Sequence, residues 1–170
     1  MICAMLLLCS VLQTRPGVHI VGSGALTVIV GLPGSGKSTL VEKMKREGAG
    51  FCVHDFHANA HMNSPLVEHS RHYGDLIRSL RRGTDCVIAD IAFCEPARRD
   101  NLERAVAREI PALRIEWVYF ENAPETCAHN IKTRARSSSA SDLRELARLT
   151  ALYILPSEVV PIPVIQAVRA

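Results

Sequence analysis

The sequence GLPGSGKST, residues 31–39, stands between an apolar run rich in β-branched residues, 25–30, and a segment of helical composition, 39–47. The local order is therefore strand, glycine-rich turn, helix. Glycines at these spacings let the backbone turn tightly and point successive N–H groups at an anion, and the start of the helix adds its positive dipole end. The stretch predicts a loop whose own backbone binds the phosphate groups of a nucleotide.

Three side chains of this loop complete the predicted site. Lys37 would reach the β- and γ-phosphates, Ser38 would offer its hydroxyl to Mg²⁺, and Thr39 would lie beside the α-phosphate or cap the helix. A glycine-rich turn can arise by chance, but the flanking strand and helix patterns agree with the motif. The predicted nucleotide contacts are Gly31, Pro33, Gly34, Ser35, Gly36, Lys37, Ser38 and Thr39.

Length and composition predict one folded domain. The chain has 170 residues, of which 48% are hydrophobic and 22% charged, which favours a folded protein over a disordered one. The formal net charge of +3 permits a polyanionic substrate without requiring nucleic acid. We expect residues 24–170 to form a single domain and residues 1–23 to be an N-terminal extension that the fold does not need.

The cysteines and the apolar N-terminal run bear on the compartment. The six cysteines form no C-x-x-C pair, and several lie in apolar runs such as 51–53, so we expect reduced core residues of a cytoplasmic protein. The apolar run 2–12 has no basic region before it and is too short to span a bilayer. We therefore expect no membrane partner.

Apolar runs alternate with helical patterns along the chain. The runs predict five strands, at 25–30, 51–54, 86–90, 113–120 and 159–165. The helical patterns lie at 39–47, 66–82, 95–109, 122–136 and 142–153, with a turn at 137–141. Such alternation is typical of βαβ units, so we expect a three-layer α/β fold with a five-stranded parallel sheet. Pro161 and Pro163 would confine the last strand to an edge.

Two aspartates end strands of this predicted sheet. Asp55 follows the second strand and Asp90 ends the third. Ligands of parallel sheets gather at the carboxyl ends of the strands, so the glycine loop and both acids are expected to meet. Asp90 would hold Mg²⁺ together with Ser38, and Asp55 would orient and deprotonate an acceptor hydroxyl. The alternative for either carboxylate is a cap of a turn or helix.

Four arginines are candidates for contacts with substrate. Arg134 and Arg136 lie at the end of a predicted helix that could fold over the nucleotide and stabilise charge on the transferring phosphoryl group. Basic residues at a helix end also complement the helix dipole, which is the alternative. Arg98 and Arg99 begin the helix after Asp90, where a positive charge opposes the dipole, and this favours a substrate-facing role for one of them.

Five histidines fall between residues 54 and 72. His57 and His61 have the i, i+4 spacing that could clamp a transition metal on a helix, but no third ligand and no H-E-x-x-H pattern accompanies them. We therefore expect His57 to line the site of the acceptor.

With these residues the chain resembles the P-loop kinase superfamily, and within it the polynucleotide-kinase-like and zeta-toxin-like small AAA-type ATPases. GLPGSGKST is specific for the phosphate loop, and CVIADIAFCEPARRDNL, residues 86–102, looks like the third strand and following helix of phage-type 5′-hydroxyl polynucleotide kinases. The segment 129–134 resembles their lid helix, and Asp55 corresponds to their acceptor-activating aspartate. The resemblance implies strand order 2-3-1-4-5, ATP with Mg²⁺, and phosphorylation of hydroxyls.

The chain departs from the polynucleotide kinases at two places. They have an arginine before the lid asparagine, where this chain has His129, and its first arginine in that helix is Arg134. Histidines around Asp55 replace the acidic and basic residues usual there. The acceptor can therefore be a small molecule or a nucleic-acid end.

Two further functions are compatible with the same loop. A nucleotide-dependent switch or regulatory ATPase would hydrolyse ATP to change a partner surface and would phosphorylate no acceptor. A binding-only module would keep nucleotide affinity without turnover. The favoured hypothesis is an ATP-dependent phosphotransferase that relies on positioning and charge neutralisation.

Overall fold

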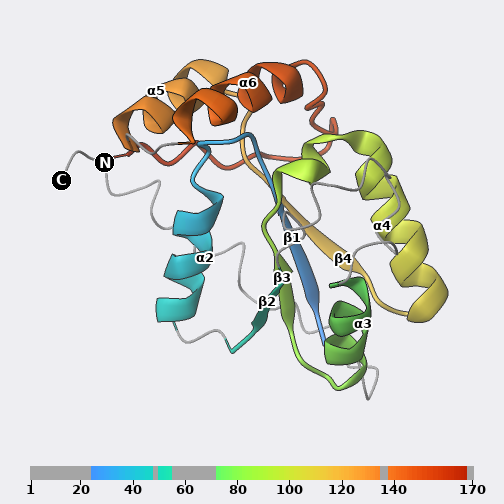
Figure 1. Ribbon diagram of the computed structural model, residues 1–170. Helices are drawn as coiled ribbons and strands as arrows, with labels where there is room; N and C mark the ends of the chain where they lie inside the picture. Colours follow the sequence, from blue (N-terminus) through green and yellow to red (C-terminus); the bar gives the residue numbers. More distant parts are fainter. Residues whose placement is uncertain (1–23, 48–49, 55–71, 135–137, 168–170) are drawn as a thin grey trace.

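The computed structural model describes residues 24–47, 50–54, 72–134 and 138–167. Its centre is a parallel sheet of four strands in the order β2-β3-β1-β4 (Figure 1). The strands are β1 (Leu26–Val30), β2 (Cys52–His54), β3 (Cys86–Ile88) and β4 (Ile115–Tyr119). Five α-helices and one 3₁₀ helix are described: α2 (Lys37–Arg46), α3 (Tyr73–Arg81), η3 (Ile91–Cys94), α4 (Pro96–Glu109), α5 (Pro124–Arg134) and α6 (Ser139–Thr150).

Helices cover both faces of the sheet. In Figure 1, α2 lies on one side of the sheet, α3 and α4 lie on the other, and α5 and α6 cross its carboxyl end. The core is divided accordingly: Leu26 and Val28 of β1 pack with residues of α3, α4 and α6, whereas Ile29 packs with α2. The predicted α/β fold with a parallel sheet is confirmed.

Strand β1 is buried along its whole length, as expected for a central parallel strand. It pairs with β3 on one side, where Leu26 lies opposite Cys86, and with β4 on the other, where Val30 lies opposite Tyr119. The chain leaves β1 directly into residues 31–36 and then enters α2. The glycine-rich stretch therefore lies at the carboxyl end of the central strand.

The prediction of a fifth strand at 159–165 is wrong. Within the described residues this segment forms a single parallel bridge, between Ile162 and Phe120. It lies beside the end of β4, where Ile162 N donates to Tyr119 O at 2.8 Å and Glu121 N donates to Ile162 O at 2.9 Å. The next N–H group on the β4 side, that of Val164, donates to the side-chain Oε1 of Glu121 at 3.2 Å and not to a backbone carbonyl, so the ladder does not continue. The order 2-3-1-4 holds without a fifth strand.

Other boundaries also differ from the sequence-based expectation. Strand β3 ends at Ile88, two residues before Asp90, because the Asp90 side chain caps η3 by accepting a hydrogen bond from Ala92 N at 2.7 Å. Helix α6 starts at Ser139, inside the expected turn. The expected helix 66–82 is described only from residue 72 onward, where it forms α3; residues 66–71 lie outside the described residues.

The cysteine prediction holds for three of the four cysteines within the described residues. Cys86, Cys94 and Cys127 are buried with free thiols, whereas Cys52 is exposed. Cys52 belongs to β2, a short strand at the edge of the sheet. An edge strand can leave its side chains open to solvent, so the burial predicted from the apolar run 51–53 is wrong for Cys52.

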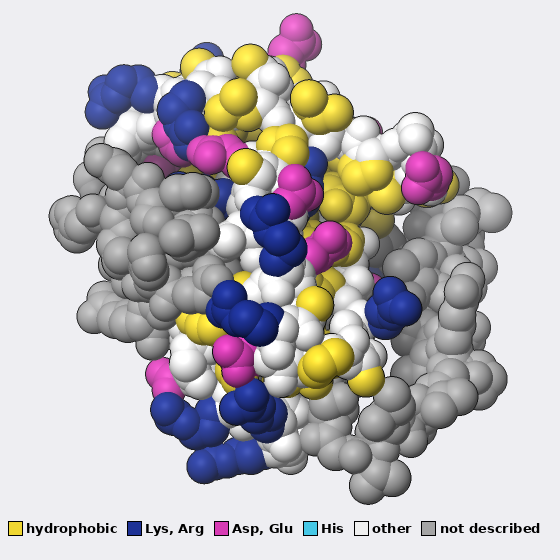
Figure 2. Space-filling view, turned by 90° about the vertical axis from the view of Figure 1, so that its right-hand side faces the viewer, with side chains coloured by type: hydrophobic (Ala, Val, Ile, Leu, Met, Phe, Trp, Pro, Cys, Tyr) yellow, Lys and Arg dark blue, Asp and Glu magenta, His cyan; other side chains and the backbone are white. Residues whose placement is uncertain are grey.

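The surface over α3 and α4 carries charges of both signs. Figure 2 shows basic and acidic side chains interspersed on this face. Two ion pairs involve these helices: Arg78 pairs with Asp75 and Arg81 with Glu109, each at 2.8 Å. No helix in the described parts of the chain combines the length and apolar character that crossing a membrane requires.

Candidate functional site

Two glycines of the loop adopt left-handed backbone conformations. Gly34 has φ +83° and Gly36 has φ +101°, values that L side chains rarely adopt. Space is restricted as well: a Cβ atom on Gly34 would lie 2.5 Å from Cys127 O, and one on Gly36 would lie 2.7 Å from Cβ of Ile165. Both positions therefore require glycine, for the backbone angle and for the close approach of α5 and the C-terminal segment.

Lys37, the first residue of α2, turns its buried side chain back over the loop. Its Nζ donates to Gly31 O at 2.7 Å and to Leu32 O at 2.9 Å. Burial lowers the pKa of Lys37 to about 8, while the negative charge of Asp90 acts in the opposite direction. The lysine is held inside the curve of the loop, with a pKa well below that of an exposed lysine.

The start of α2 lacks a side-chain cap. Its N-cap residue is Gly36, and no side chain accepts a hydrogen bond from the first turn. Ser38 and Thr39 of that turn are exposed. An uncapped helix start preceded by left-handed glycines suits an anion, because the N–H groups and the helix dipole both favour negative charge.

Asp90 lies beyond the carboxyl end of β3, the strand next to β1. The residue is 3% exposed, and one carboxylate oxygen caps η3. Its charge acts on Lys37, so the structure brings this predicted metal ligand to the same end of the sheet as the loop. Carboxylate and hydroxyl oxygens are ligands that Mg²⁺ accepts, so Asp90 and the exposed Ser38 fit a magnesium nucleotide.

Helix α5 packs against the outside of the loop. Asn130, which is fully buried, donates from Nδ2 to Gly34 O at 2.8 Å. Arg134, at the end of α5, is exposed, and its charge lowers the pKa of Lys37. The sequence alone indicates no contact of Asn130, because its partners belong to segments far apart in the chain; the resemblance of residues 129–134 to a lid helix was the available signal.

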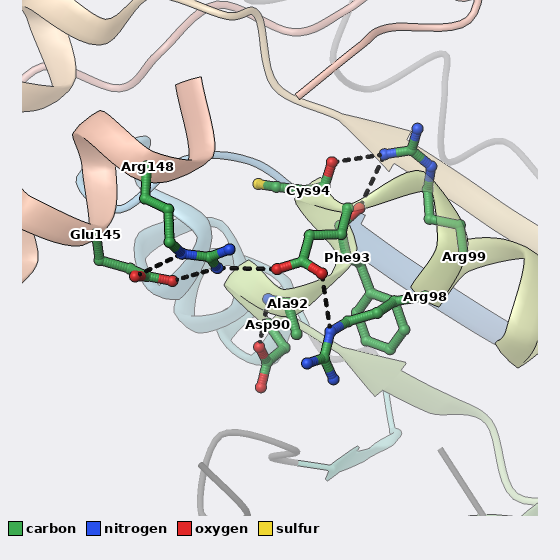
Figure 3. A network of polar contacts seen from close by, with 9 residues as sticks. Asp90, Ala92, Phe93, Cys94, Arg98, Arg99, Glu145 and Arg148 are labelled. Atoms are coloured by element: carbon green, nitrogen blue, oxygen red, sulfur yellow. Dashed lines mark hydrogen bonds and ion pairs between the residues drawn. The ribbon is translucent and has the colours of Figure 1, made fainter. Parts of the chain in front are cut away.

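Arg98 and Arg99 face different surroundings (Figure 3). Arg99 is buried, and its guanidinium donates to Phe93 O at 2.9 Å, to Cys94 O at 3.3 Å and to Ile154 O at 3.1 Å. The guanidinium carbon also lies 5.6 Å from the centre of the Tyr119 ring. Arg98 forms a partly exposed ion pair with Glu95 at 3.4 Å. The contacts of Arg99 thus lie within the fold.

Three predicted site residues lie outside the described residues: Asp55, His57 and Arg136. Their roles stay predictions. Within the described ranges, no group of three or more His, Cys, Asp or Glu side chains could hold a metal ion.

The two buried thiols near Lys37 have raised pKa values. Burial raises the pKa of Cys94 to about 12 and that of Cys127 to about 11, although the charge of Lys37 lowers both. They therefore stay protonated at neutral pH and act as small apolar side chains beside the loop.

Comparison with known proteins agrees with this geometry. The family model described as an AAA domain matches residues 26–156. The chain belongs to this family. A search of the curated proteins found no match.

Solved structures show the same fold at low sequence identity. APE1195 aligns with a TM-score of 0.57 and 20% identity, over 85% of this chain and 86% of that one. A gluconokinase from Sinorhizobium meliloti 1021 aligns with a TM-score of 0.50 and 18% identity, over 85% of each chain. A putative fructose transport system kinase from Silicibacter sp. TM1040 aligns with a TM-score of 0.52 and 15% identity, over 96% and 98%. These matches concern the fold.

Proposed function

We propose that the protein is an ATP-dependent phosphotransferase that moves the γ-phosphate of ATP to a hydroxyl of a small molecule or of a nucleic-acid end. The observation that carries this proposal is the arrangement of Lys37 and the left-handed glycines at the carboxyl end of β1, with Asp90 beyond the neighbouring strand β3. The family match and the kinase names of two structural neighbours support the class of activity.

The loop would hold the nucleotide through its backbone. The amides around Gly34 and Gly36 and the uncapped start of α2 would bind phosphate oxygens, and Lys37 would exchange the carbonyls of Gly31 and Leu32 for the β- and γ-phosphates. Ser38 and Asp90 would hold Mg²⁺, whose charge neutralises phosphate oxygens when it is bound.

The transfer would occur in line. The acceptor hydroxyl gives its proton to the Asp55 carboxylate, its oxygen bonds to the γ-phosphorus, and the bond between that phosphorus and the β–γ bridging oxygen breaks to release ADP. Arg134 or Arg136 would stabilise the charge on the transferring group. His57 and Arg98 would line the acceptor side.

The test uses γ-labelled ATP and Mg²⁺ with pooled nucleosides, 5′-hydroxyl oligonucleotides, sugars and a metabolite extract. Label should move from ATP to an acceptor in wild-type protein and vanish in Asp55→Asn. Asp75→Asn is the matched control, because Asp75 is an exposed residue of α3 paired with Arg78. Release of free phosphate alone, unchanged in Asp55→Asn, would contradict the kinase and favour the regulatory ATPase.

A further inference from the structure

The side chain of Asn130 connects three segments of the chain. Its Nδ2 donates to Gly34 O at 2.8 Å and to Ile165 O at 2.9 Å, and its Oδ1 accepts from Ala167 N at 2.8 Å. Both amide donors therefore meet carbonyls and the amide oxygen meets an N–H group. The opposite orientation of the amide would place its oxygen against two carbonyls, so this network fixes which atom is nitrogen.

The C-terminal segment 162–167 lies along the phosphate loop. Ile165 N donates to Ser35 O at 3.1 Å, and the side chain of Ile165 occupies the space beside Gly36. Val164 N donates to Oε1 of Glu121 at 3.2 Å. The loop is thus held from one side by this segment, which Asn130 in turn holds through Ile165 and Ala167.

Helix α5 holds the loop from another side. The carbonyl oxygen of Cys127 comes so close that a Cβ atom on Gly34 would lie only 2.5 Å from it. Asn130, three residues further along the helix, donates a hydrogen bond to the carbonyl oxygen of Gly34. Arg134 follows Asn130 by four residues, so both lie on one face of α5. The contact at Asn130 therefore sets where α5 presents Arg134 relative to the loop.

We propose that Asn130 is a positioning residue for nucleotide binding: it fixes the phosphate loop at Gly34 against both α5 and the C-terminal segment. It touches no phosphate itself. The proposal rests on the proposed function for its effect on the nucleotide, but its effect on the loop can be measured in the protein without nucleotide.

The first measurement is amide hydrogen exchange of the ligand-free protein. Asn130→Asp keeps the oxygen that accepts from Ala167 and replaces the donor to Gly34 and Ile165. Exchange should accelerate about tenfold or more in peptides covering 31–36 and 162–167, and should stay unchanged in β1 and α4. Asn130→Ala serves if the buried carboxylate prevents folding. Unchanged exchange in these two segments, or a uniform rise over the whole protein, would overturn the proposal.

The second measurement separates positioning from general stability. Asn122→Ala is the matched control, because the Asn122 amide also donates to two carbonyls, those of Thr150 and Tyr153, neither of which belongs to the loop. In Asn130→Ala the Kd of ATP, measured by calorimetric titration, should rise about tenfold, and Asn122→Ala should leave it unchanged. Equal effects of the two substitutions on ATP affinity would contradict positioning. If wild-type protein binds no nucleotide, the proposed function fails, and hydrogen exchange still tests Asn130.

Discussion

The Nζ atom of Lys37 donates a hydrogen bond to the carbonyl oxygen of Gly31 at 2.7 Å, across the loop that both residues belong to. The loop thus satisfies its own lysine with backbone oxygens. The ammonium is nonetheless poorly solvated, and burial lowers its pKa to about 8. The site carries a charge that the fold alone does not stabilise well.

This burial predicts a pH dependence of stability. The folded-state pKa of Lys37, about 8, lies below the ordinary lysine value of 10.5, so the unfolded chain binds more protons between these values. The free energy of unfolding of wild type, relative to Lys37→Met, should therefore be flat below pH 8 and rise by roughly 3 kcal/mol at most up to pH 10.5. Urea unfolding of both proteins across this range measures it. A pH-independent difference between them would rule out a buried, titrating lysine.

Nucleotide affinity should depend on the same titration. Because phosphate oxygens attract the protonated lysine, ATP should bind with constant affinity below pH 8 and more weakly above it, by up to about tenfold per pH unit. Lys37→Met should bind weakly at every pH. Calorimetric titration from pH 6.5 to 9.5 measures both, and a loss of affinity of equal slope in Lys37→Met would assign the titration to another group.

Gly36→Ala should damage the loop more than the same change at another left-handed glycine. Gly36 has φ +101°, and its new Cβ would meet Ile165, whereas Gly83 has φ +78° and nothing within 4 Å. Both substitutions carry backbone strain of about 1–2 kcal/mol, but only Gly36→Ala should also displace residues 162–167 and reduce ATP affinity. Thermal unfolding and ATP binding of the pair test this, and similar affinities would show that the contact with Ile165 is unimportant.

Asp90→Asn should weaken the magnesium-dependent part of ATP binding. Asparagine keeps the oxygen that accepts from Ala92 N and removes the charge. Asp85→Asn is the control: Asp85 also accepts from a backbone amide, Ala25 N at 2.8 Å, but at the opposite end of β3. The Kd of ATP should rise about tenfold for Asp90→Asn with Mg²⁺ and little with EDTA. An equal loss in both conditions would argue against a magnesium ligand.

Arg99→Met should lower stability, whereas Arg98→Met should not. Arg99 satisfies three carbonyls inside the protein, so its loss should cost about 2–3 kcal/mol of unfolding free energy. Arg98 makes a partly exposed ion pair with Glu95, worth under about 1 kcal/mol. Urea unfolding compares them. Full stability of Arg99→Met with loss of phosphoryl transfer would instead place Arg99 at the substrate.

The central strand and the phosphate loop could be predicted from sequence because each follows from a local pattern. The run 26–30 is apolar except for Thr27, and it proves to be buried throughout. The glycines at 34 and 36 need left-handed angles, and they have them. Propensity and position along the chain are sufficient for such features.

Features that depend on tertiary contacts could not be predicted in this way. A positive charge in the first turn of α4 suggested a substrate-facing residue, but Arg99 turns back to the carbonyls that end η3, and the short helix was not visible in the sequence. The role of Asn130 becomes visible only when two distant segments, the loop at Gly34 and residues 165–167, meet at its side-chain amide. Such roles follow from the packing of the chain and not from its local composition.

The single bridge between Ile162 and Phe120 also bears on how copies of the protein meet. Ile162 turns its N–H and C=O toward β4, so the backbones of Pro161 and Pro163 turn away from it, and neither offers an N–H group. A strand from another molecule would find no donors at this border. The protein thus ends its sheet beside the phosphate loop in a way that opposes self-association through strand pairing.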